Sequence, residues 1–287
     1  MANSFVYQEE WATKLQDRLD HPTNFTEVMD VQYTNTRVLN NPYMTYPTVV
    51  SHTRGTAYTY SDATITNESL TISTSQILPQ FIDRADLAQT DFAKQMTLAE
   101  IQGQLLQEKL ESAMLAQHAS WTDVGDSSGT ITSSVTTQIT VSASNIDDII
   151  RGIKRIVNVA NGQKLAARNG IFFIWRPADF ELLEAFVQAN GFATADATLK
   201  AGAVSGIHYM GADHYVSNDH TANHVFAGVK KVCTMGVLRD TYGQVVVVDE
   251  PGNGTGNLSA IGVVTRVDYG FAWWNNTKTL VYDVNVA

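Results

Sequence analysis

The residue types best suited to chemistry gather in one short segment of this chain, residues 208–224. Four of the seven histidines lie there, with Asp213 and Asp219 among them. The four are His208, His214, His220 and His224. Imidazole and carboxylate are ligands for zinc or iron, and the step from His220 to His224 would place two ligands on one side of a helix. A metal-dependent enzyme is therefore one hypothesis.

The context of these histidines favours a different interpretation. Asn218, Asp219 and Asn223 are typical of a loop, and the sequence contains no His-Glu-x-x-His signature. The segment is then a polar surface loop whose charge could respond to pH. We expect no catalytic residue, no bound metal and no other cofactor, and we keep the metal-dependent enzyme as the weaker alternative.

Three other motifs do not fit the chemistry that they resemble. Gly252, Gly254 and Gly256 resemble a phosphate-binding loop, but β-type sequence follows where a helix N-terminus is needed. Ser205 misses the Gly-x-Ser-x-Gly nucleophile elbow by one position. Cys233, the single cysteine, lies in a mixed apolar context that favours packing over nucleophilic chemistry. The motifs thus predict a protein that is not an enzyme.

Composition further limits the class of protein to which the chain can belong. The chain has 287 residues, 44% of them hydrophobic and 17% charged, which is typical of a folded protein with a large core. A net charge of −10 with only 19 Lys and Arg argues against a basic grip on nucleic-acid phosphates. We expect neither a signal peptide nor a membrane span, because the N-terminus lacks the required pattern and no apolar run approaches ~18 residues. A single cysteine suits folding in a reducing cytoplasm.

The most prominent element is a long helix predicted over residues 98–119. Thr97 and Glu100 form a capping box before it, and Asp86 with Gln89 suggests a second, short helix over 87–95. The polar edge of the long helix is predicted to comprise Glu100, Gln104, Gln107, Glu111 and His118. Its apolar arc is predicted to comprise Leu98, Ile101, Leu105, Leu106, Leu110 and Met114, packed on a C-terminal sheet.

The chain before this helix is predicted to lie outside the core. Residues 1–43 have the composition of an arm, with an amphipathic start over 9–19. Residues 45–74 are rich in Thr, Ser, Tyr and Val and predict a two-stranded ribbon with a turn near Ser61 and Asp62. A two-stranded ribbon is marginal alone, so we expect it to lie on something else, such as another subunit.

The chain after the helix predicts an α/β subdomain and then a β-sheet. Residues 123–144 are expected to form a hairpin or flexible excursion. A capping box of Ser144 and Asp147 should open a helix that stops at Asn161-Gly162, followed by a buried strand over 171–175 and a helix from Pro177 to about 189. The final third should be mainly strand. There 244–249 is strongly β-prone, and 261–274 and 279–286 are expected to pair across Asn275-Asn276.

This order of parts resembles the major capsid protein of tailed bacteriophages, with its α+β Hong Kong 97 fold. Two stretches carry the resemblance. Residues 70–95 are similar to the passage from the family's extended loop into its spine helix. Residues 177–218 resemble its axial domain, in which a helix opened by Pro-Ala-Asp precedes a glycine-rich stretch. The matching residues after that helix are Leu199, Gly202, Gly206, Gly211 and Tyr215-Val216-Ser217-Asn218.

The resemblance implies a division of the chain into four parts. These are an N-terminal arm (1–43), an extended loop (44–75), a peripheral domain (76–143 and 226–287, with spine helix 98–119) and an axial domain (144–225). It also implies self-assembly through pentamers and hexamers into an icosahedral shell around double-stranded DNA, with no sequence-specific contact to that DNA and no membrane contact. The implied location is the virion, assembled in the host bacterial cytoplasm.

The implied partners are further copies of the chain, a separate scaffolding protein, a portal and decoration proteins. A separate scaffold is expected because the N-terminus lacks the long helical segment that some members cleave off. The covalent cross-link of the family's founding member is not expected, since residues 44–75 contain no lysine and only Arg54 as a cation. The alternative within the same fold is an encapsulin-like compartment that encloses enzymes instead of DNA.

Overall fold

The computed structural model describes residues 25–44, 47–58, 60, 62–83, 93–190, 207–241, 244–249, 260–274 and 278–287. It is a mixed helix and sheet structure, as expected. The helices are α1 (Phe25–Val28), α3 (Ala93–Leu115), α4 (Ile146–Val159), α5 (Gln163–Asn169) and α6 (Pro177–Asn190), with 3-10 helices η1 (Ala116–Ser120) and η2 (Lys278–Leu280). The strands are β1 (Asp30–Thr34), β2 (Val38–Met44), β3 (Ile65–Thr71), β4 (Thr74–Asp83), β5 (Thr122–Ser127), β6 (Thr130–Thr132), β7 (Ile171–Trp175), β8 (Ile207–Tyr209), β9 (Ala212–Val216), β10 (His224–Val229), β11 (Cys233–Leu238), β12 (Gln244–Asp249), β13 (Ala260–Trp273) and β14 (Val281–Asn285).

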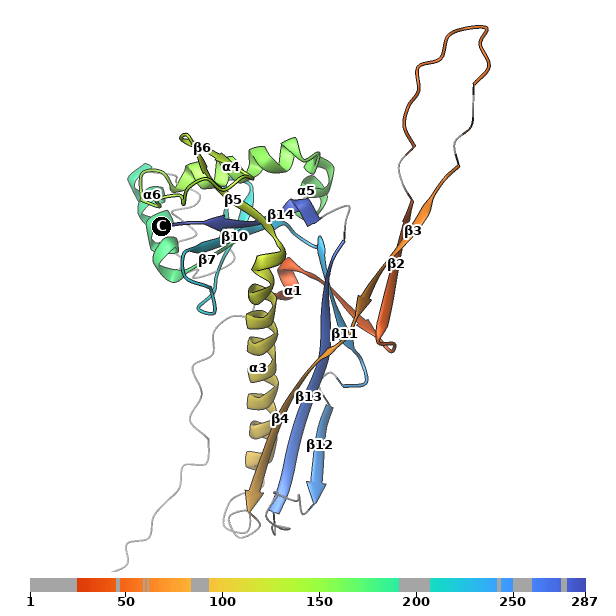
Figure 1. Cartoon of the computed structure of the whole chain (residues 1–287). Helices are drawn as coiled ribbons and strands as arrows, with labels where there is room; N and C mark the ends of the chain where they lie inside the picture. Colours follow the sequence, from red (N-terminus) through yellow and green to blue (C-terminus); the bar gives the residue numbers. More distant parts are fainter. Residues whose placement is uncertain are drawn as a thin grey trace, which may run out of the picture.

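The long helix α3 runs along one face of a sheet, as Figure 1 shows. It already includes Thr97, so the capping box predicted at Thr97 and Glu100 was wrong. The preceding Ala93, Lys94, Gln95 and Met96 are good helix formers and continue the helix upstream. A separate short helix was expected over 87–95. Residues 87–92 lie outside the described residues, and residues 93–95 belong to α3.

The buried side of α3 is wider than predicted. Leu106, Leu110 and Met114 are buried as expected. Glu111 was assigned to the solvent edge, but it is only 1% exposed. The helix contacts α1 in addition to β4 and β13, so more than one stripe of its side chains is covered. No helix in the described part of the chain is long and apolar enough to cross a membrane.

The sheet under α3 is built around the long strand β13. β4 pairs with β13 along one edge, while β12 and β11 follow one another along its other edge, all antiparallel. β1 then adds to β11 in parallel. Residues 28–34 were expected to belong to an arm outside the core, but Val28 and Met29 are buried and β1 is part of this sheet. The partner strand lies some 200 residues away in sequence, beyond the reach of a local pattern.

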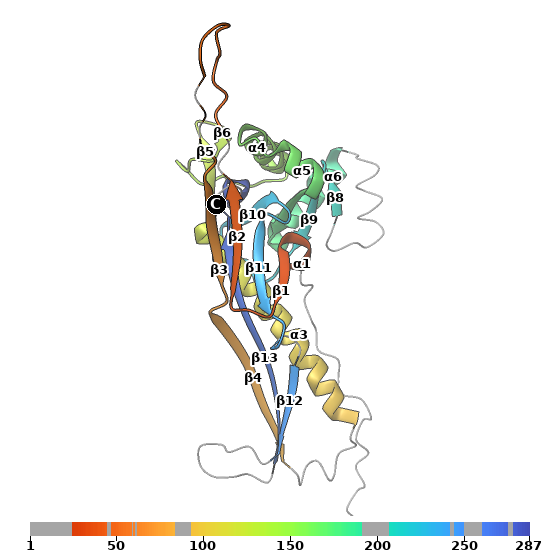
Figure 2. The ribbon, with the colours of Figure 1, turned by 90° about the vertical axis from the view of Figure 1, so that its right-hand side faces the viewer.

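A second sheet of seven strands has the order β6-β5-β14-β10-β7-β9-β8. The expected pairing of residues 261–274 with 279–286 was wrong, because β13 belongs to the first sheet and β14 lies between β10 and β5 in the second. The buried strand at 171–175 is confirmed as β7, with every residue buried. The helices α4, α5 and α6 gather around this sheet in Figures 1 and 2.

Of the two expected ends of α4, the C-terminal end was correct and the N-terminal cap was wrong. The helix starts after Asn145 with no side-chain cap, so the capping box at Ser144 and Asp147 was wrong. The Asn145 side chain instead accepts a hydrogen bond from the Ser142 backbone N–H at 2.8 Å. At the other end Asn161 has φ +59° and the Gly162 N–H donates to Val157, which confirms the predicted left-handed stop.

Residues 123–144 are integrated into the second sheet. β5 pairs in parallel with β14, and β6 turns back onto β5 as a short hairpin. Val124 and Ile139 are buried, and the Ile139 N–H donates to the Asn285 carbonyl at 2.9 Å. The segment is therefore a hairpin with a returning strand-like stretch, which agrees with the first of the two expectations.

The predicted ribbon is present, with shifted boundaries. β2 pairs antiparallel with β3, so its first strand begins at Val38 inside the expected arm. The chain turns at residues 54–56, where Gly55 has φ +89°, a conformation that glycine adopts without strain. The turn expected near Ser61 and Asp62 was wrong for Asp62, which is not in a turn. Ser61 lies outside the described residues. The ribbon projects away from the body in Figures 1 and 2.

Candidate functional site

The four clustered histidines have four different environments. His208 is exposed and its Nδ1 donates to Asp213 Oδ1 at 2.7 Å. Lys230 Nζ lies 2.6 Å from the other oxygen of the same carboxylate. Burial alone would raise the pKa of Asp213, but the hydrogen bonds from Lys230 and His208 hold it below its usual value. This is an ion-pair network at the start of β9.

His214 is a core residue. Its ring is fully buried, and Nδ1 accepts a hydrogen bond from the Trp175 indole N–H at 2.9 Å. Because the indole can only donate, the ring proton is on Nε2, which donates to the Tyr209 carbonyl at 3.1 Å. Burial lowers the pKa of His214 to about 4, so the ring is neutral at pH 7. The prediction of a polar surface loop was wrong for this residue.

His220 lies in the loop before β10 and packs flat on Phe226, with ring centroids 4.2 Å apart. Its ring nitrogens lie 3.1 Å from the Thr221 carbonyl and 3.0 Å from the Ile174 carbonyl. Burial lowers the pKa of His220. The spacing of His220 and His224 would suit a helix, but here it spans a loop and the first residue of a strand. The two rings therefore have separate partners.

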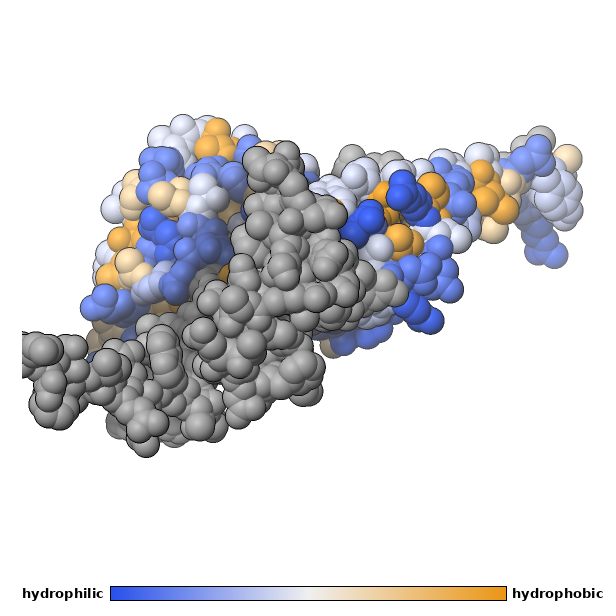
Figure 3. Space-filling view, turned by 90° about the horizontal axis from the view of Figure 1, so that it is seen from below, coloured by the Kyte–Doolittle hydropathy of each residue, from blue (hydrophilic) through white to orange (hydrophobic). Residues whose placement is uncertain are grey.

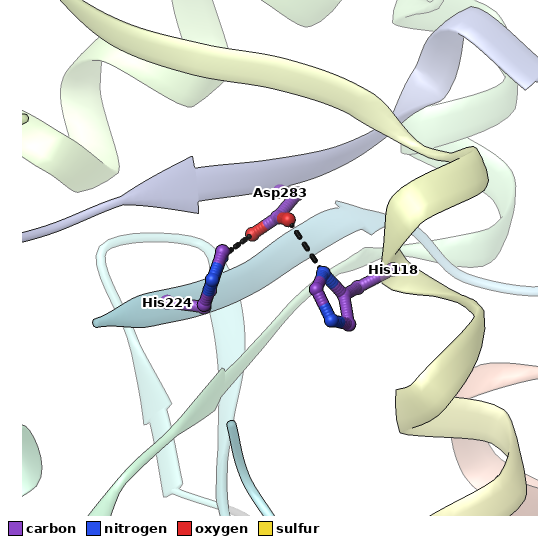
Figure 4. Close-up of side chains that lie close together, drawn as sticks. All are labelled: His118, His224 and Asp283. Carbon is purple, nitrogen blue, oxygen red and sulfur yellow. Dashed lines mark hydrogen bonds and ion pairs between the residues drawn. The ribbon is translucent and has the colours of Figure 1, made fainter. Parts of the chain in front are cut away.

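His224 belongs to a different group of three residues. Its Nδ1 lies 2.7 Å from Asp283 Oδ1, and His118 Nδ1 lies 2.9 Å from Asp283 Oδ2 (Figure 4). Within the described ranges this is the one set of three or more His, Cys, Asp or Glu side chains whose ligand atoms all lie within 4.8 Å of one another. We call it the His118–His224–Asp283 cluster. It joins η1, β10 and β14.

Sequence reasoning did not find this cluster. His118 was placed on the polar edge of the long helix, and Asp283 was not singled out. One signal was available: Asp283 interrupts the apolar run of β14, where a carboxylate at a buried position needs hydrogen-bond donors. The donors themselves come from residues 118 and 224, and only the order of strands in the second sheet brings them to Asp283.

The remaining sequence motifs add no chemistry. Gly252, Gly254, Gly256 and Ser205 lie outside the described residues. Cys233 is buried at the start of β11, and burial raises the pKa of its thiol well above the usual value. A thiol in that state is a poor nucleophile at neutral pH.

A second candidate site is the surface of the ribbon. Every described residue from 47 to 67 is exposed, among them Val49 at 96%, Val50 at 80% and Tyr60 at 87%. Tyr58 packs edge-on against both His52 and Tyr60, with ring centroids 5.8 and 5.3 Å apart. Figure 3 shows hydrophobic and hydrophilic residues side by side on the projecting part of the molecule. Exposed apolar groups gathered on a projecting segment are typical of a protein interface.

The base of the ribbon is fixed to the body. Leu70 and Ile72 are buried, and the Ile72 N–H donates to the Arg37 carbonyl at 2.8 Å. Gly236 on β11 and Gly270 on β13 leave room for this base: a Cβ on Gly236 would lie 2.7 Å from Leu70, and one on Gly270 would overlap the Thr71 carbonyl. The ribbon therefore has an anchored base and an exposed outer half.

Comparison with known proteins gives a structural answer only. No family model and no curated protein matches the chain. A solved chain from Mycobacterium phage Che8 superposes with a TM-score of 0.71 at 14% identity, over 98% of both chains. The capsid structure of Cyanophage P-SCSP1u matches with a TM-score of 0.62 at 13% identity, over 98% of this chain and 93% of that one. The mature capsid of bacteriophage PhiM1 matches with a TM-score of 0.63 at 12% identity, over 98% and 92%. The chain thus has the fold of phage capsid chains, which confirms the Hong Kong 97-like fold class.

Proposed function

We propose that this chain is the coat subunit of a tailed-phage capsid, which self-assembles through pentamers and hexamers into an icosahedral shell around double-stranded DNA. The observation that carries the proposal is the exposed outer half of the ribbon, residues 47–67. The segment beyond the paired strands β2 and β3, with exposed Val49, Val50 and Tyr60, gains stability when it lies on another surface. In a shell of identical copies, that surface is a neighbouring subunit.

The parts of the structure then take the roles that the resemblance implies. The ribbon of β2 and β3 is the extended loop, and α3 with the first sheet is the peripheral domain. The second sheet with α4, α5 and α6 is the axial domain. Its strands β5, β6 and β14 and most of β10 come from residues 76–143 and 226–287, which the resemblance assigns to the peripheral domain, so we propose that the boundary between the two domains shifts accordingly. The N-terminal segment is the arm, shortened by the part that enters the first sheet as β1. Virion location, assembly in the host cytoplasm and the scaffold, portal and decoration partners belong to the same proposal.

The acidic composition supports the DNA part of the proposal. A shell that holds packaged DNA without binding its sequence needs no dense basic lining, and the chain has a net charge of −10. DNA is then retained by enclosure. Lys230, the one buried Lys or Arg among the described residues, already pairs with the carboxylate of Asp213.

The test is assembly of the full chain, expressed with its scaffolding protein where the neighbouring genes encode one. Sedimentation velocity and negative-stain electron microscopy should show pentamers, hexamers and closed shells. Small discrete oligomers under all assembly conditions would contradict the proposal. Shells that contain a cargo enzyme in place of nuclease-protected DNA would instead support an encapsulin-like compartment.

A matched pair of variants tests the role of the ribbon itself. Val49→Asp with Val50→Asp should prevent shell closure while the subunit keeps its circular dichroism spectrum and melting temperature, since both side chains are exposed. Val159→Asp, which alters a valine that is 78% exposed at the end of α4, serves as control and should assemble. Normal shells from the ribbon variant would show that the ribbon is not the contact.

A further inference from the structure

We propose that the His118–His224–Asp283 cluster is a binding site for a divalent transition-metal ion of the zinc type. Two imidazole nitrogens and one carboxylate oxygen are a donor set that suits such ions. The proposal does not rest on the assembly function, because it follows from the geometry of one subunit. It also differs from the sequence hypothesis, which grouped His224 with three other histidines.

The three ligands are already close to the spacing that a metal needs. Their ligand atoms lie within 4.8 Å of one another. Tetrahedral zinc with bonds of about 2.0 to 2.1 Å separates its ligand atoms by about 3.3 Å. Asp283 and His224 are positioned by neighbouring strands of the second sheet and His118 by η1, and we expect rotation of the imidazole rings to close the remaining distance.

The surroundings hold the rings in place and leave a path for the ion. Phe226, which pairs with Asp283 across β10 and β14, stacks on His118 with ring centroids 5.4 Å apart. The Asp283 side chain is 3% exposed, whereas those of His118 and His224 are 22% and 21% exposed. The carboxylate is therefore desolvated, while the ligand rings can be reached from solvent. A water molecule would complete the coordination.

A further carboxylate lies on the same side of the sheet. Asp123 of β5 pairs with Asp283 in parallel register, so their side chains share one face. Asp123 is exposed and lies outside the group of three. Its negative charge adds to that of Asp283 and favours a cation at this place.

The protonation of the rings is consistent with both a metal-free and a metal-bound form. An ionised carboxylate only accepts hydrogen bonds, so without metal each Nδ1 carries the proton that it donates to Asp283. When the metal binds at Nδ1, a neutral ring carries its proton on Nε2 instead. The competing interpretation is a hydrogen-bonded triad that never binds metal.

The experiment is a zinc titration of the full chain after removal of metals with EDTA and exchange into metal-free buffer. Competition with a chromogenic chelator should give one Zn²⁺ per subunit with micromolar or tighter affinity. His118→Gln and His224→Gln should each weaken binding at least tenfold. His208→Gln removes a histidine that donates to another aspartate, Asp213, and should bind like the wild type.

A second readout guards against loss of folding in the variants. Co²⁺ added to the wild type should give visible absorption bands of a nitrogen- and oxygen-ligated site, and Zn²⁺ should raise the melting temperature. Both effects should be absent from His224→Gln, whose circular dichroism should match the wild type. Equal zinc affinity in wild type and His224→Gln, or no binding by the wild type, would overturn the proposal and leave the hydrogen-bonded triad.

Discussion

Thr265 donates a hydrogen bond from Oγ1 to Oε1 of Gln102 over 3.0 Å, and both side chains are buried. The same glutamine donates from Nε2 to Gln80 Oε1, also at 3.0 Å. One side chain of the long helix α3 thus contacts both β13 and β4. This polar link holds the helix at one position along the sheet, where apolar contacts alone would be less directional.

Replacement of Gln102 tests this link. Gln102→Leu should lower the free energy of unfolding by about 1 to 3 kcal/mol, because the buried Thr265 hydroxyl loses its acceptor. Gln104→Leu, on the exposed side of the same helix, should change it by less than about 0.5 kcal/mol. Urea unfolding of the unassembled subunits, followed by circular dichroism, measures both. Equal effects would show that the link adds nothing.

Leu110 and Leu105 should differ in their tolerance of substitution by a polar residue. Leu110 is 0% exposed, whereas Leu105 is half-buried. Leu110→Ala should cost about 2 to 5 kcal/mol, and Leu110→Asp should abolish folding and assembly. Leu105→Asp should be less severe at the level of folding. Soluble yield and shell yield measure the series, and shells of normal yield from Leu110→Asp would contradict the placement of the helix.

Gly270 and Gly236 provide a matched pair at the base of the ribbon. A Cβ at Gly270 meets the backbone of Thr71, which cannot move without moving the strand, whereas a Cβ at Gly236 meets only side chains, the nearest being the end of Leu70. Gly270→Ala should therefore cost about 1 to 3 kcal/mol and loosen the ribbon, with Gly236→Ala milder. Limited proteolysis at the ribbon base and thermal unfolding report the two effects. The reverse order would refute this account.

Gly103 should be replaceable with a gain in stability. It lies within α3, and a Cβ there meets nothing within 4 Å. Gly103→Ala should raise the free energy of unfolding by about 0.5 to 1 kcal/mol through helix propensity. Gly129 also has open space but a φ of +78°, so Gly129→Ala should be destabilising. Chemical denaturation measures the free energy of unfolding of both variants. The comparison separates the effect of free space around the new Cβ from the effect of the backbone φ angle.

His214 should make stability depend on pH. Its pKa is lowered to about 4 in the folded chain and is about 6.5 when unfolded, so the unfolded state binds the extra proton between these values. Its contribution is complete above pH 6.5 and falls by about 3 kcal/mol as the pH drops toward 4. His214→Gln should flatten this part of the profile. Urea midpoints at several pH values provide the measurement.

The local sequence pattern was sufficient to predict the type and burial of a segment whose burial does not depend on which partner covers it. The apolar spacing of α4 and the continuous apolar run of β7 predicted their type and burial correctly. The sequence of elements also predicted the fold class. Helix starts were less predictable: Thr97 and Ser144 resemble caps, but Thr97 lies inside α3 and Asn145 precedes α4. A cap motif competes with neighbouring helix propensity and with other hydrogen-bond partners.

Pairings between distant segments could not be predicted. The residues around Val28 and Met29 do not indicate that β1 pairs with β11. Likewise, residues 281–285 do not indicate that β14 pairs with β10 in the second sheet and not with β13. Either alternative satisfies the local hydrogen-bonding needs of a strand. The choice depends on the packing of the whole chain.

By itself, then, the sequence determined an acidic α+β chain with a long amphipathic helix and a Thr-rich ribbon that cannot bury itself, because composition and periodicity act over a few residues. Only the tertiary structure decided which histidines meet a carboxylate. His208, His214, His220 and His224 are neighbours in sequence and have separate partners, whereas His118, His224 and Asp283 are brought together by the order of strands in one sheet. Side-chain chemistry depends on distances in space, and strand order sets those distances.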